Sequence, residues 1–512
     1  MAFGIVHVWA CASTSAVNAP PVSTLQVVAA SLPPATQVRS PAPAAGARPN
    51  GDAWRDEILY FVVLDRFANG DPANDVQVDP SAKGAFHGGD LKGLTAQLDE
   101  LADLGITAIW LTPVVKNIPD FVTGAGFPDW GYHGYWADDF TRLDPRFGTE
   151  AELKALVDAA HARKIKVLLD VVYNHAGYGS RYTTDPKTRD WLRSPSECGR
   201  DDELTMCLSG LPDFKTERPE VADYLLNAQL TWGRKSGVDG FRLDTLKHID
   251  HPFWTEHRER VRAQLGPDFF LLGEVWGGDP QVLDPWFVRD EIDAGFDFSF
   301  QGSTLGFVMG RGRTVAYDRY LAQRHRTRRG YLLAHFLSSH DVEGALSQLQ
   351  GDQQAFRLAA VLQLTTVGMP TVYYGEEVGR LGGKWPHNRS NMPWGERDLL
   401  PGKGQPRDDA LREFYKRLIA IRRAHPALTR GTHRGLSVEG DVYAFARQDA
   451  LASDGVVVVV NRGRTPGKVS IQSLPEWGGR AVVDLLSGKE ASPGGGPQFD
   501  IAPRSALILA PR

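Results

Sequence analysis

The sequence predicts an α/β protein built on a (β/α)8 TIM barrel, with a long insert after the third strand and a C-terminal antiparallel β-sandwich. Between Ile58 and Tyr374, eight apolar, β-branched runs alternate with amphipathic stretches. Strands joined by crossover helices pair in parallel, and eight such units are typical of a closed barrel. After about Ala427 the pattern changes to short β-like runs separated by Gly and Pro, which predicts the sandwich.

The barrel elements follow one another in the order strand, helix, strand. Strands are expected at Ile58–Phe67, Ile106–Thr112, Val167–Tyr173, Val238–Asp244, Phe269–Val275, Ala294–Phe300, Leu332–Ser338 and Thr371–Tyr374. Helices are expected at Leu91–Leu104, Glu150–Lys164, Pro219–Lys235, Phe253–Leu265, Gln353–Thr366 and Arg407–Arg423. Because the carboxyl ends of barrel strands meet at one face, polar residues that follow the strands are expected to form the active site.

The remaining segments set the domain boundaries. Residues 1–50 are rich in Ala, Ser, Val and Pro and carry few charges, so we interpret them as leader and linker. The barrel is assigned to residues 51–175 and 215–427. Residues 176–214 have little periodicity and are interpreted as an inserted subdomain, because loops of this length are usually functional. The sandwich is assigned to residues 428–512.

The composition narrows the function classes. The chain has 512 residues, enough for one large domain and a smaller one. Its 57 Lys and Arg and 62 Asp and Glu residues give a net charge of −5, which provides no basic surface for nucleic acid or an anionic membrane. No run of about 18 apolar residues occurs, so we expect no transmembrane segment.

Three acidic residues follow predicted barrel strands. Asp244 lies in GFRLDTLKH, Glu274 in LLGEVW and Asp341 ends AHFLSSHD. Any one of them alone could be a solvated carboxylate or a helix N-cap. All three at the same face of the barrel predict a catalytic site.

These segments, together with GITAIWLTP at 105–113 and DVVYNH at 170–175, resemble the conserved regions of the α-amylase family of glycoside hydrolases (family 13), in the same order. The resemblance covers about residues 54–400 and implies an α-glucan or maltooligosaccharide substrate. It implies that Asp244 is the nucleophile, Glu274 the general acid and base, and Asp341 the carboxylate that grips the substrate ring.

The physical chemistry agrees with these roles. A retaining glycosidase needs one ionised carboxylate that attacks the anomeric carbon and one protonated carboxyl that donates to the leaving oxygen. Arg242 lies two residues before Asp244 on the same strand face and is expected to keep it ionised. Glu274 is followed by Val275 and Trp276, which favour a raised pKa.

The same resemblance implies further substrate contacts. Tyr135, in GYHGYWADDF, resembles the tyrosine that stacks under the sugar at the cleavage point. His175 and His340 resemble donors to sugar hydroxyls, and Arg389 resembles the arginine that pairs with the gripping carboxylate. The adjacent Lys247 and His248 resemble the acceptor-side contacts of α-amylases.

Calcium is the cofactor that the resemblance implies. DRFANGDPAND at 65–75 and GGD at 88–90 gather short oxygen ligands around glycines, which suits Ca²⁺, although the spacing alone indicates only an Asx-rich turn. This segment resembles the N-terminal calcium site of cyclodextrin-processing and neopullulanase-like members. The implied ligands are Asn69, Asp71, Asn74, Asp75, the Gly88 carbonyl and Asp90. A second implied site comprises Asn174, Asp213 and the His248 carbonyl.

Cysteine usage and the leader favour export to the periplasm or the outside. Cys198 and Cys207 both lie in the insert and fit no zinc or redox motif. We expect a disulfide if the protein reaches an oxidising compartment and two free thiols if it stays in the cytosol. Cys11, in a segment that resembles an export signal, could be the lipidated cysteine of a lipoprotein or a chance residue of the leader.

The leading interpretation is an α-amylase-type hydrolase of α-1,4-linked glucans. Lys247 and His248 favour it, whereas DRFANGDPAND and FHGGD favour a cyclomaltodextrinase or neopullulanase. That branch usually carries an N-terminal β-domain that supports dimers, which residues 1–53 are too short to supply, so we expect a monomer. A transglycosylase, in which a sugar captures the intermediate instead of water, stays open. A catalytically inactive glycan-binding member is disfavoured because all three carboxylates are retained.

Overall fold

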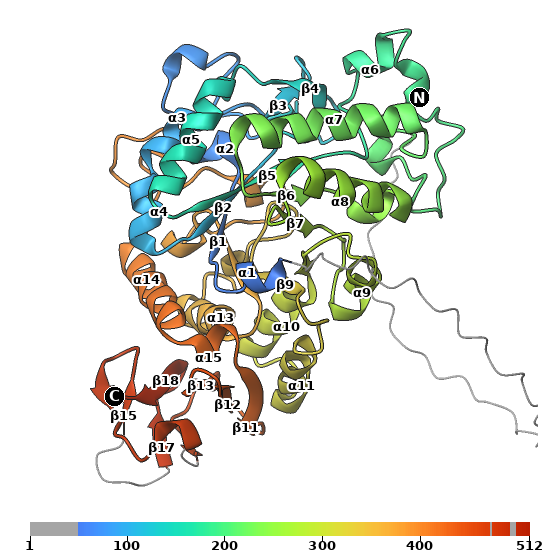
Figure 1. The fold of residues 1–512 in the computed structure, drawn as a ribbon. Coiled ribbons are helices and arrows are strands. Elements are labelled where there is room, and N and C mark those ends of the chain that lie inside the picture. The colour runs from blue at the N-terminus through green and yellow to red at the C-terminus, as the bar shows by residue number, and fades with distance from the viewer. Residues whose placement is uncertain (1–49, 472–473, 492–497) are drawn as a thin grey trace, which may run out of the picture. The chain divides into compact units, whose positions relative to one another are not determined.

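The computed structural model describes residues 50–471, 474–491 and 498–512. The leader interpretation, Cys11 included, lies outside this range except for Asn50. Eight parallel strands close a barrel in the order β1-β10-β9-β8-β7-β6-β5-β2 (Figure 1). They are β1 (Leu59–Val62), β2 (Ala108–Leu111), β5 (Lys166–Val171), β6 (Gly240–Leu243), β7 (Phe270–Gly273), β8 (Ala294–Asp297), β9 (Leu332–Phe336) and β10 (Met369–Tyr373). The predicted barrel is confirmed.

Most predicted strands were too long, and two of them run into a helix. The run from Ile58 to Phe67 leaves the sheet after Val62 and continues as the short helix α2 (Leu64–Phe67). The run from Ala294 likewise ends at Asp297, before helix α10 (Ser299–Val308). All four residues of α2 are buried, Asp65 and Arg66 included, so burial continues across the end of the strand. An apolar run alone does not distinguish a buried helix from a strand.

Helices cover the outside of the barrel. The longer ones are α3 (Leu91–Ala96), α4 (Leu98–Leu104), α5 (Glu150–Ala162), α7 (Pro219–Ser236), α8 (His251–Leu265), α9 (Pro280–Val288), α10, α11 (Thr314–Arg324), α13 (Gln353–Thr365) and α14 (Asp409–Ala424). The four-residue ones are α1 (Gly51–Trp54), α2, α6 (Arg181–Thr184), α12 (Ala345–Gln348) and α15 (Pro426–Thr429). The single helix predicted for Leu91–Leu104 is two helices, interrupted at Gln97.

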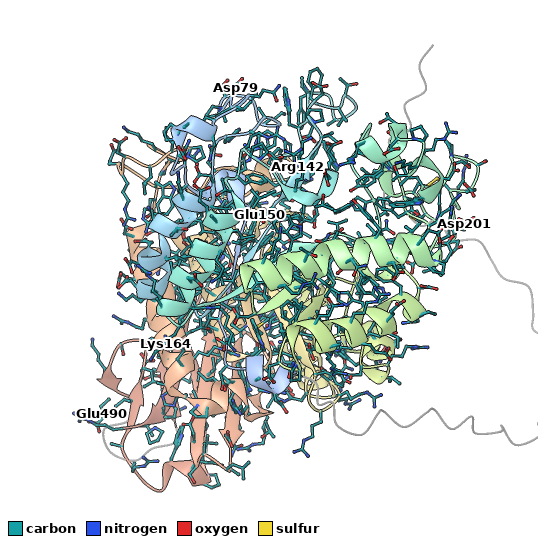
Figure 2. The ribbon with its side chains drawn as sticks, turned by 45° about the horizontal axis from the view of Figure 1, so that its top comes forward. Asp79, Arg142, Glu150, Lys164, Asp201 and Glu490 are labelled. Atoms are coloured by element: carbon teal, nitrogen blue, oxygen red, sulfur yellow. A yellow bond between two sulfur atoms is a disulfide. The ribbon has the colours of Figure 1, made fainter. Side chains whose placement is uncertain are left out.

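Two long connections rise above the carboxyl ends of the strands. The connection after β2 contains an antiparallel pair, β3 (Val115–Asn117) and β4 (Ala137–Leu143), that the sequence analysis did not predict. The insert at 176–214 contains α6, short 3-10 turns and a disulfide between Cys198 and Cys207. The expected disulfide is therefore present, in the loop that Asp201 marks in Figure 2.

The C-terminal region forms antiparallel sheets, as predicted. A six-stranded sheet has the order β11-β12-β13-β18-β15-β16, and β14 pairs with β17. The strands are β11 (Thr432–Ser437), β12 (Val442–Asp449), β13 (Asp454–Asn461), β14 (Gly467–Ser470), β15 (Val482–Asp484), β16 (Lys489–Glu490), β17 (Gln498–Ile501) and β18 (Ser505–Pro511).

Side chains along the strands of the large sheet point alternately to its two faces, and both faces are buried. On β12, Tyr443 and Phe445 join the main core of the barrel, whereas Ala444 and Ala446 pack into a second core with Phe499 of β17. The sheet therefore contacts the barrel on one face and completes a sandwich on the other. Within the part of the chain that the structure describes, no helix is long and apolar enough to span a membrane.

Candidate active site

The three acidic residues singled out in the sequence lie at the predicted face of the barrel. Asp244 directly follows β6, Glu274 directly follows β7, and Asp341 lies in the loop after β9. The side chains of Asp244 and Glu274 are each 9% exposed, whereas the Asp341 side chain is 32% exposed. All three line one open cleft.

A single buried arginine joins two of these carboxylates. Nη1 of Arg242 lies 2.6 Å from Oδ1 of Asp244, and Nη2 lies 3.3 Å from Oε2 of Glu274. Arg242 alternates with its neighbours on β6, so its side chain and that of Asp244 leave the strand on the same face. The Arg242 guanidinium and the Asp244 carboxylate therefore form a buried ion pair.

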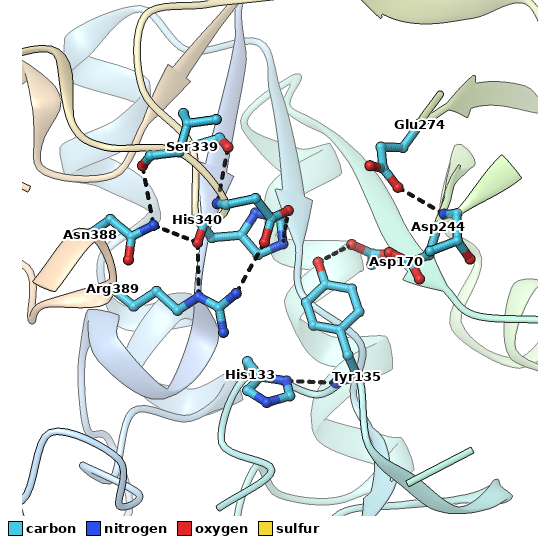
Figure 3. Close-up of polar contacts among 12 residues, drawn as sticks. His133, Tyr135, Asp170, Asp244, Glu274, Ser339, His340, Asn388 and Arg389 are labelled. Atoms are coloured by element: carbon cyan, nitrogen blue, oxygen red, sulfur yellow. Dashed lines mark hydrogen bonds and ion pairs between the residues drawn. The ribbon is translucent and has the colours of Figure 1, made fainter. Parts of the chain in front are cut away.

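Asp170, at the end of β5, was missed as a site residue although it lies in DVVYNH. Its carboxylate accepts hydrogen bonds from Trp110 Nε1 at 2.9 Å and from Arg242 at 3.0 Å. It also accepts one from Tyr135 Oη at 2.7 Å (Figure 3). Burial raises its pKa to about 7, although Arg242 opposes this. Asp170 therefore fixes both Arg242 and the Tyr135 ring at the floor of the cleft.

Glu274 has the environment of a proton donor. Burial raises its pKa to about 7, although Arg242 acts in the opposite direction. Its Oε2 accepts a hydrogen bond from the backbone N–H of Thr245 at 2.8 Å. Thr245 adopts the left-handed conformation, with φ of 50°, which is uncommon for a β-branched residue. The chain next to Asp244 is therefore bent so that its amide points at Glu274.

Asp341 is oriented from two sides (Figure 3). Arg389 Nη2 donates to Oδ1 at 3.0 Å, and His340 Nε2 lies 3.1 Å from Oδ2. Arg389 Nε also donates to the His340 carbonyl at 2.9 Å, as does the Asn388 side chain at 2.7 Å. Burial acts to raise the pKa of Asp341, but His340 and Arg389 hold it below its usual range.

The histidines of the cleft are neutral at pH 7. Burial lowers the pKa of His340 to about 3, and it also lowers the pKa of His175 and of His133. Tyr135 stacks on His340 with ring centroids 5.3 Å apart. Neutral imidazoles can each donate one hydrogen bond to a sugar hydroxyl.

The cleft contains further aromatic side chains. Trp276 and Trp385 line it and remain 50% and 43% exposed, and the insert contributes Leu208, Ser209 and Leu211. The sequence analysis did not select these side chains. Exposure of large aromatic rings beside acidic residues is the signal that could have found the two tryptophans, but exposure is not visible in a sequence.

Lys247 and His248 are held by the insert. Lys247 Nζ pairs with the Glu203 carboxylate at 2.7 Å, and His248 Nδ1 lies 2.8 Å from the Glu203 carbonyl oxygen. They lie in the turn that follows Asp244, at the border between barrel and insert. Their assignment as acceptor-side contacts stays a prediction.

The six residues of the first predicted calcium site come together. Asn69 donates to Asp75, Asn74 lies beside Asp90, and Asp90 accepts from the Asp71 amide. A Cβ at Gly88 would clash with Asp75 Oδ1 at 2.7 Å and Asn69 Nδ2 at 2.8 Å, so the turn leaves a small cradle between the Asp75 carboxylate and the Asn69 amide. This donor set fits Ca²⁺.

Other contacts already occupy part of that cradle. Lys92 pairs with Asp71, and both carboxylate oxygens of Asp90 accept backbone amides. Over the described residues, no group of three or more His, Cys, Asp and Glu that could hold a metal was found.

The second predicted calcium site fits less well. Asn174 and Asp213 are both buried, and their segments lie side by side. Asp213 pairs with His175 in an isolated β-bridge, and the Phe214 amide donates to the Asn174 carbonyl. However, Arg193 Nε donates to Asp213 Oδ1 at 2.9 Å, so a cation of the chain itself already contacts this carboxylate.

Comparison with known proteins decides the family. Residues 61–400 match the model of the α-amylase catalytic domain. The chain belongs to the α-amylase family of glycoside hydrolases. Among α-amylase family members it is 33% identical to neopullulanase 2 of Thermoactinomyces vulgaris, over 89% of this chain and 78% of that protein. It is 35% identical to a cyclomaltodextrinase of a Bacillus species, over 80% and 74%.

A solved α-amylase has the same fold. The α-amylase of Geobacillus thermoleovorans, crystallised with acarbose, superposes with a TM-score of 0.77 and 32% identity, covering 90% of this chain and 99% of that one. The chain is therefore a glycoside hydrolase, as the sequence analysis expected. Relatives of both kinds, α-amylases and cyclodextrin-processing enzymes, are found.

Proposed function

We propose that this protein is a retaining hydrolase of α-1,4-glucosidic bonds in starch and maltooligosaccharides. The observation that carries the proposal is the contact of one buried guanidinium, that of Arg242, with both Asp244 and Glu274. Arg242 forms an ion pair with Asp244, while burial raises the pKa of Glu274 to about 7. One carboxylate is thereby suited to attack and the other to donate a proton.

The reaction has two steps. Asp244 attacks the anomeric carbon while Glu274 donates its proton to the glycosidic oxygen, which leaves with the aglycone as a free hydroxyl. Glu274, now ionised, takes a proton from water, whose oxygen attacks the same carbon and releases Asp244. The two inversions give retention, which proton NMR of the first product formed tests. An inverted product would contradict the nucleophilic role of Asp244.

Asp341, His340, His175 and Tyr135 are suited to hold the reacting ring. Asp341 accepts hydrogen bonds from sugar hydroxyls, and neutral His175 donates to them, whereas His340 uses its N–H on Asp341. Arg389 keeps Asp341 ionised and oriented. The Tyr135 ring, fixed by Asp170, offers a flat apolar surface to the sugar face.

Cyclodextrins and pullulan are the second candidate substrates. The identities to neopullulanase 2 and to a cyclomaltodextrinase, at 33% and 35%, favour them. A time-resolved product profile on soluble starch, β-cyclodextrin and pullulan separates the candidates. A spread of maltooligosaccharides from starch while the other two persist supports the α-amylase. Faster loss of cyclodextrin or pullulan contradicts it and supports the second candidate, and larger mixed oligosaccharides indicate transglycosylation.

We also propose that Ca²⁺ binds in the turn of Asn69, Asp71, Asn74, Asp75, Gly88 and Asp90. The cradle at Gly88 and its oxygen donors support this. When bound, the ion would supply structural stability to the loop after β1. We further propose an exported monomer, and the Cys198–Cys207 disulfide supports an oxidising compartment.

A further inference from the structure

A cavity of about 280 Å³ opens at the end of the barrel where the strands begin. Asp56 and Glu57, just before β1, and Thr107, just before β2, form one wall. The end of α14 and the residues that follow it form the other wall. Because the catalytic carboxylates follow the carboxyl ends of the strands, this cavity lies at the opposite end of the barrel from the cleft. It takes no part in the reaction proposed above.

Both carboxylates that line the cavity already contact a cation. Asp56 pairs with Arg430, and Glu57 Oε1 lies 2.8 Å from Nζ of Lys166 on β5. Arg423, in the last turn of α14, lines the cavity and is exposed. It forms no hydrogen bond or ion pair with any residue that the structure describes. Its positive charge is therefore free at the wall of the cavity.

Arg422 brings a second positive charge to the same wall, from the buried side. It is 1% exposed, and its Nε has no partner among the described residues. Its terminal nitrogens donate only to backbone carbonyls, those of Leu364, Thr366, Gly368 and Leu428. Burial lowers the pKa of Arg422 to about 9, although Asp56 opposes this and Arg324 adds to it. A buried charge without a counter-ion is costly, so an anion at this wall would stabilise the guanidinium.

The chemistry of this wall suits a phosphate group. Guanidinium groups bind phosphate oxygens through paired N–H donors, and two positive charges without a carboxylate partner match a phosphate dianion. Thr107 adds a hydroxyl, whose oxygen accepts the Ile58 amide at 2.8 Å, so that its proton can be donated to the anion. The cavity is many times larger than the space that one ordered water needs, which leaves room for the anion.

We infer that Arg422, Arg423 and Thr107 form a binding site for a phosphate dianion at the amino-terminal end of the barrel. Arg423 contacts the anion from the exposed side and Arg422 from the buried side. The bound anion joins the end of α14 to the segments that lead into β1 and β2. The site accepts free phosphate or the phosphate of a sugar ester, since the recognised group is the same. It does not depend on the proposed function, because no residue of the cleft contributes to it.

The test is isothermal titration calorimetry of the full chain with inorganic phosphate and with glucose 6-phosphate, at constant ionic strength set with sodium chloride. We expect one phosphate site with a Kd of about 1 mM or tighter. Arg423→Gln should weaken binding about tenfold, because it removes one guanidinium and leaves the fold around Arg422 in place. Asp56→Asn should tighten binding about threefold, because it removes a negative charge and releases Arg430.

Arg329→Gln is the matched control. Arg329 is exposed, precedes β9 at the same end of the barrel and forms no ion pair within the described part of the chain, but it does not line the cavity. The control should keep the wild-type Kd, and starch turnover should be the same in all these variants. Arg422 itself is left in place, because it also holds four backbone carbonyls.

The outcomes separate the two sources of the phosphate group. Binding of inorganic phosphate alone assigns the free ion, and binding of both ligands, each weakened by Arg423→Gln, extends the site to esters. No binding of either ligand at about 10 mM overturns the site. Equal weakening by Arg329→Gln and Arg423→Gln also overturns it. Binding of glucose 6-phosphate that Arg423→Gln leaves unchanged reports recognition of the sugar elsewhere and counts against the site.

Discussion

Asp244 is the residue on which the proposed chemistry depends most directly. Asp244→Asn removes the nucleophile, and we expect starch turnover to fall by at least about 1,000-fold. The amide has nearly the same shape, and Arg242 keeps its contacts with Asp170 and Glu274. The melting temperature should therefore change little, which calorimetry checks. Turnover close to that of the wild type would remove Asp244 from the nucleophilic role.

Glu274 sets the alkaline side of the pH profile. It must be protonated to act as the acid, and burial raises its pKa to about 7. Activity should therefore be present below that pH and decline as pH rises through about 7. The profile of kcat/KM on a maltooligosaccharide measures this. A substrate whose leaving group needs no protonation serves as the control, and its profile should lose the alkaline decline.

Among the site residues, the sequence analysis found those that belong to compact motifs. Asp244, Glu274 and Arg242 follow from position relative to strands, because the barrel brings strand ends together. Asp170 was missed, since its role depends on side chains that converge from distant segments. Asp170 accepts hydrogen bonds from Tyr135, which is 35 residues away in the sequence, and from Trp110, which is 60 residues away. No spacing rule reports such a contact.

The Asx-rich turn after β1 carries the calcium prediction. Removal of a bound ion leaves the carboxylates of Asp75 and Asp90 without its charge, so we expect EDTA to lower the melting temperature. Asp75→Ala should abolish this sensitivity to EDTA. Asp90 is a poorer choice, because it also caps α3 through the Gly93 amide. A melting temperature that excess chelator leaves unchanged would argue against a structural calcium.

The disulfide closes a loop in the insert, with nine residues of sequence separation between Cys198 and Cys207. Loop-closure entropy gives an upper bound of about 2 to 3 kcal/mol for its contribution to stability. We expect the Cys198→Ser, Cys207→Ser double variant to unfold at lower temperature in calorimetry. Reduced wild-type protein should behave in the same way. If the variant and the wild type melt together, the loop is held by other contacts, such as those of Glu203 with Lys247 and His248.

The order of elements was predictable because each barrel strand is a buried apolar run. The ends of the strands were not predictable, since burial continues from β1 into the helix α2. The β3-β4 pair was also missed. Its strands are three and seven residues long and are separated by a long connection, so neither alternation nor a tight turn identifies them.

The barrel and the C-terminal sheets share a core. Tyr443 and Phe445 of β12 and Val456, Val458 and Val460 of β13 belong to the same apolar cluster as the barrel. A continuous core of this kind couples the two regions, so we expect one cooperative transition in calorimetry. Two separate transitions, or a circular dichroism melt of the sheets that precedes loss of tryptophan fluorescence, would contradict this.

The left-handed conformation of Thr245 has a further consequence for the molecule as a whole. A β-branched residue in this conformation costs of the order of 1 to 3 kcal/mol, and the rest of the fold must offset it. The strain is located beside Asp244, where the Thr245 amide points at Glu274. Stability and turnover therefore compete at this position. A glycine there removes the backbone strain, but it no longer holds the amide toward Glu274. Selection for heat resistance alone would act against the geometry on which the acid depends.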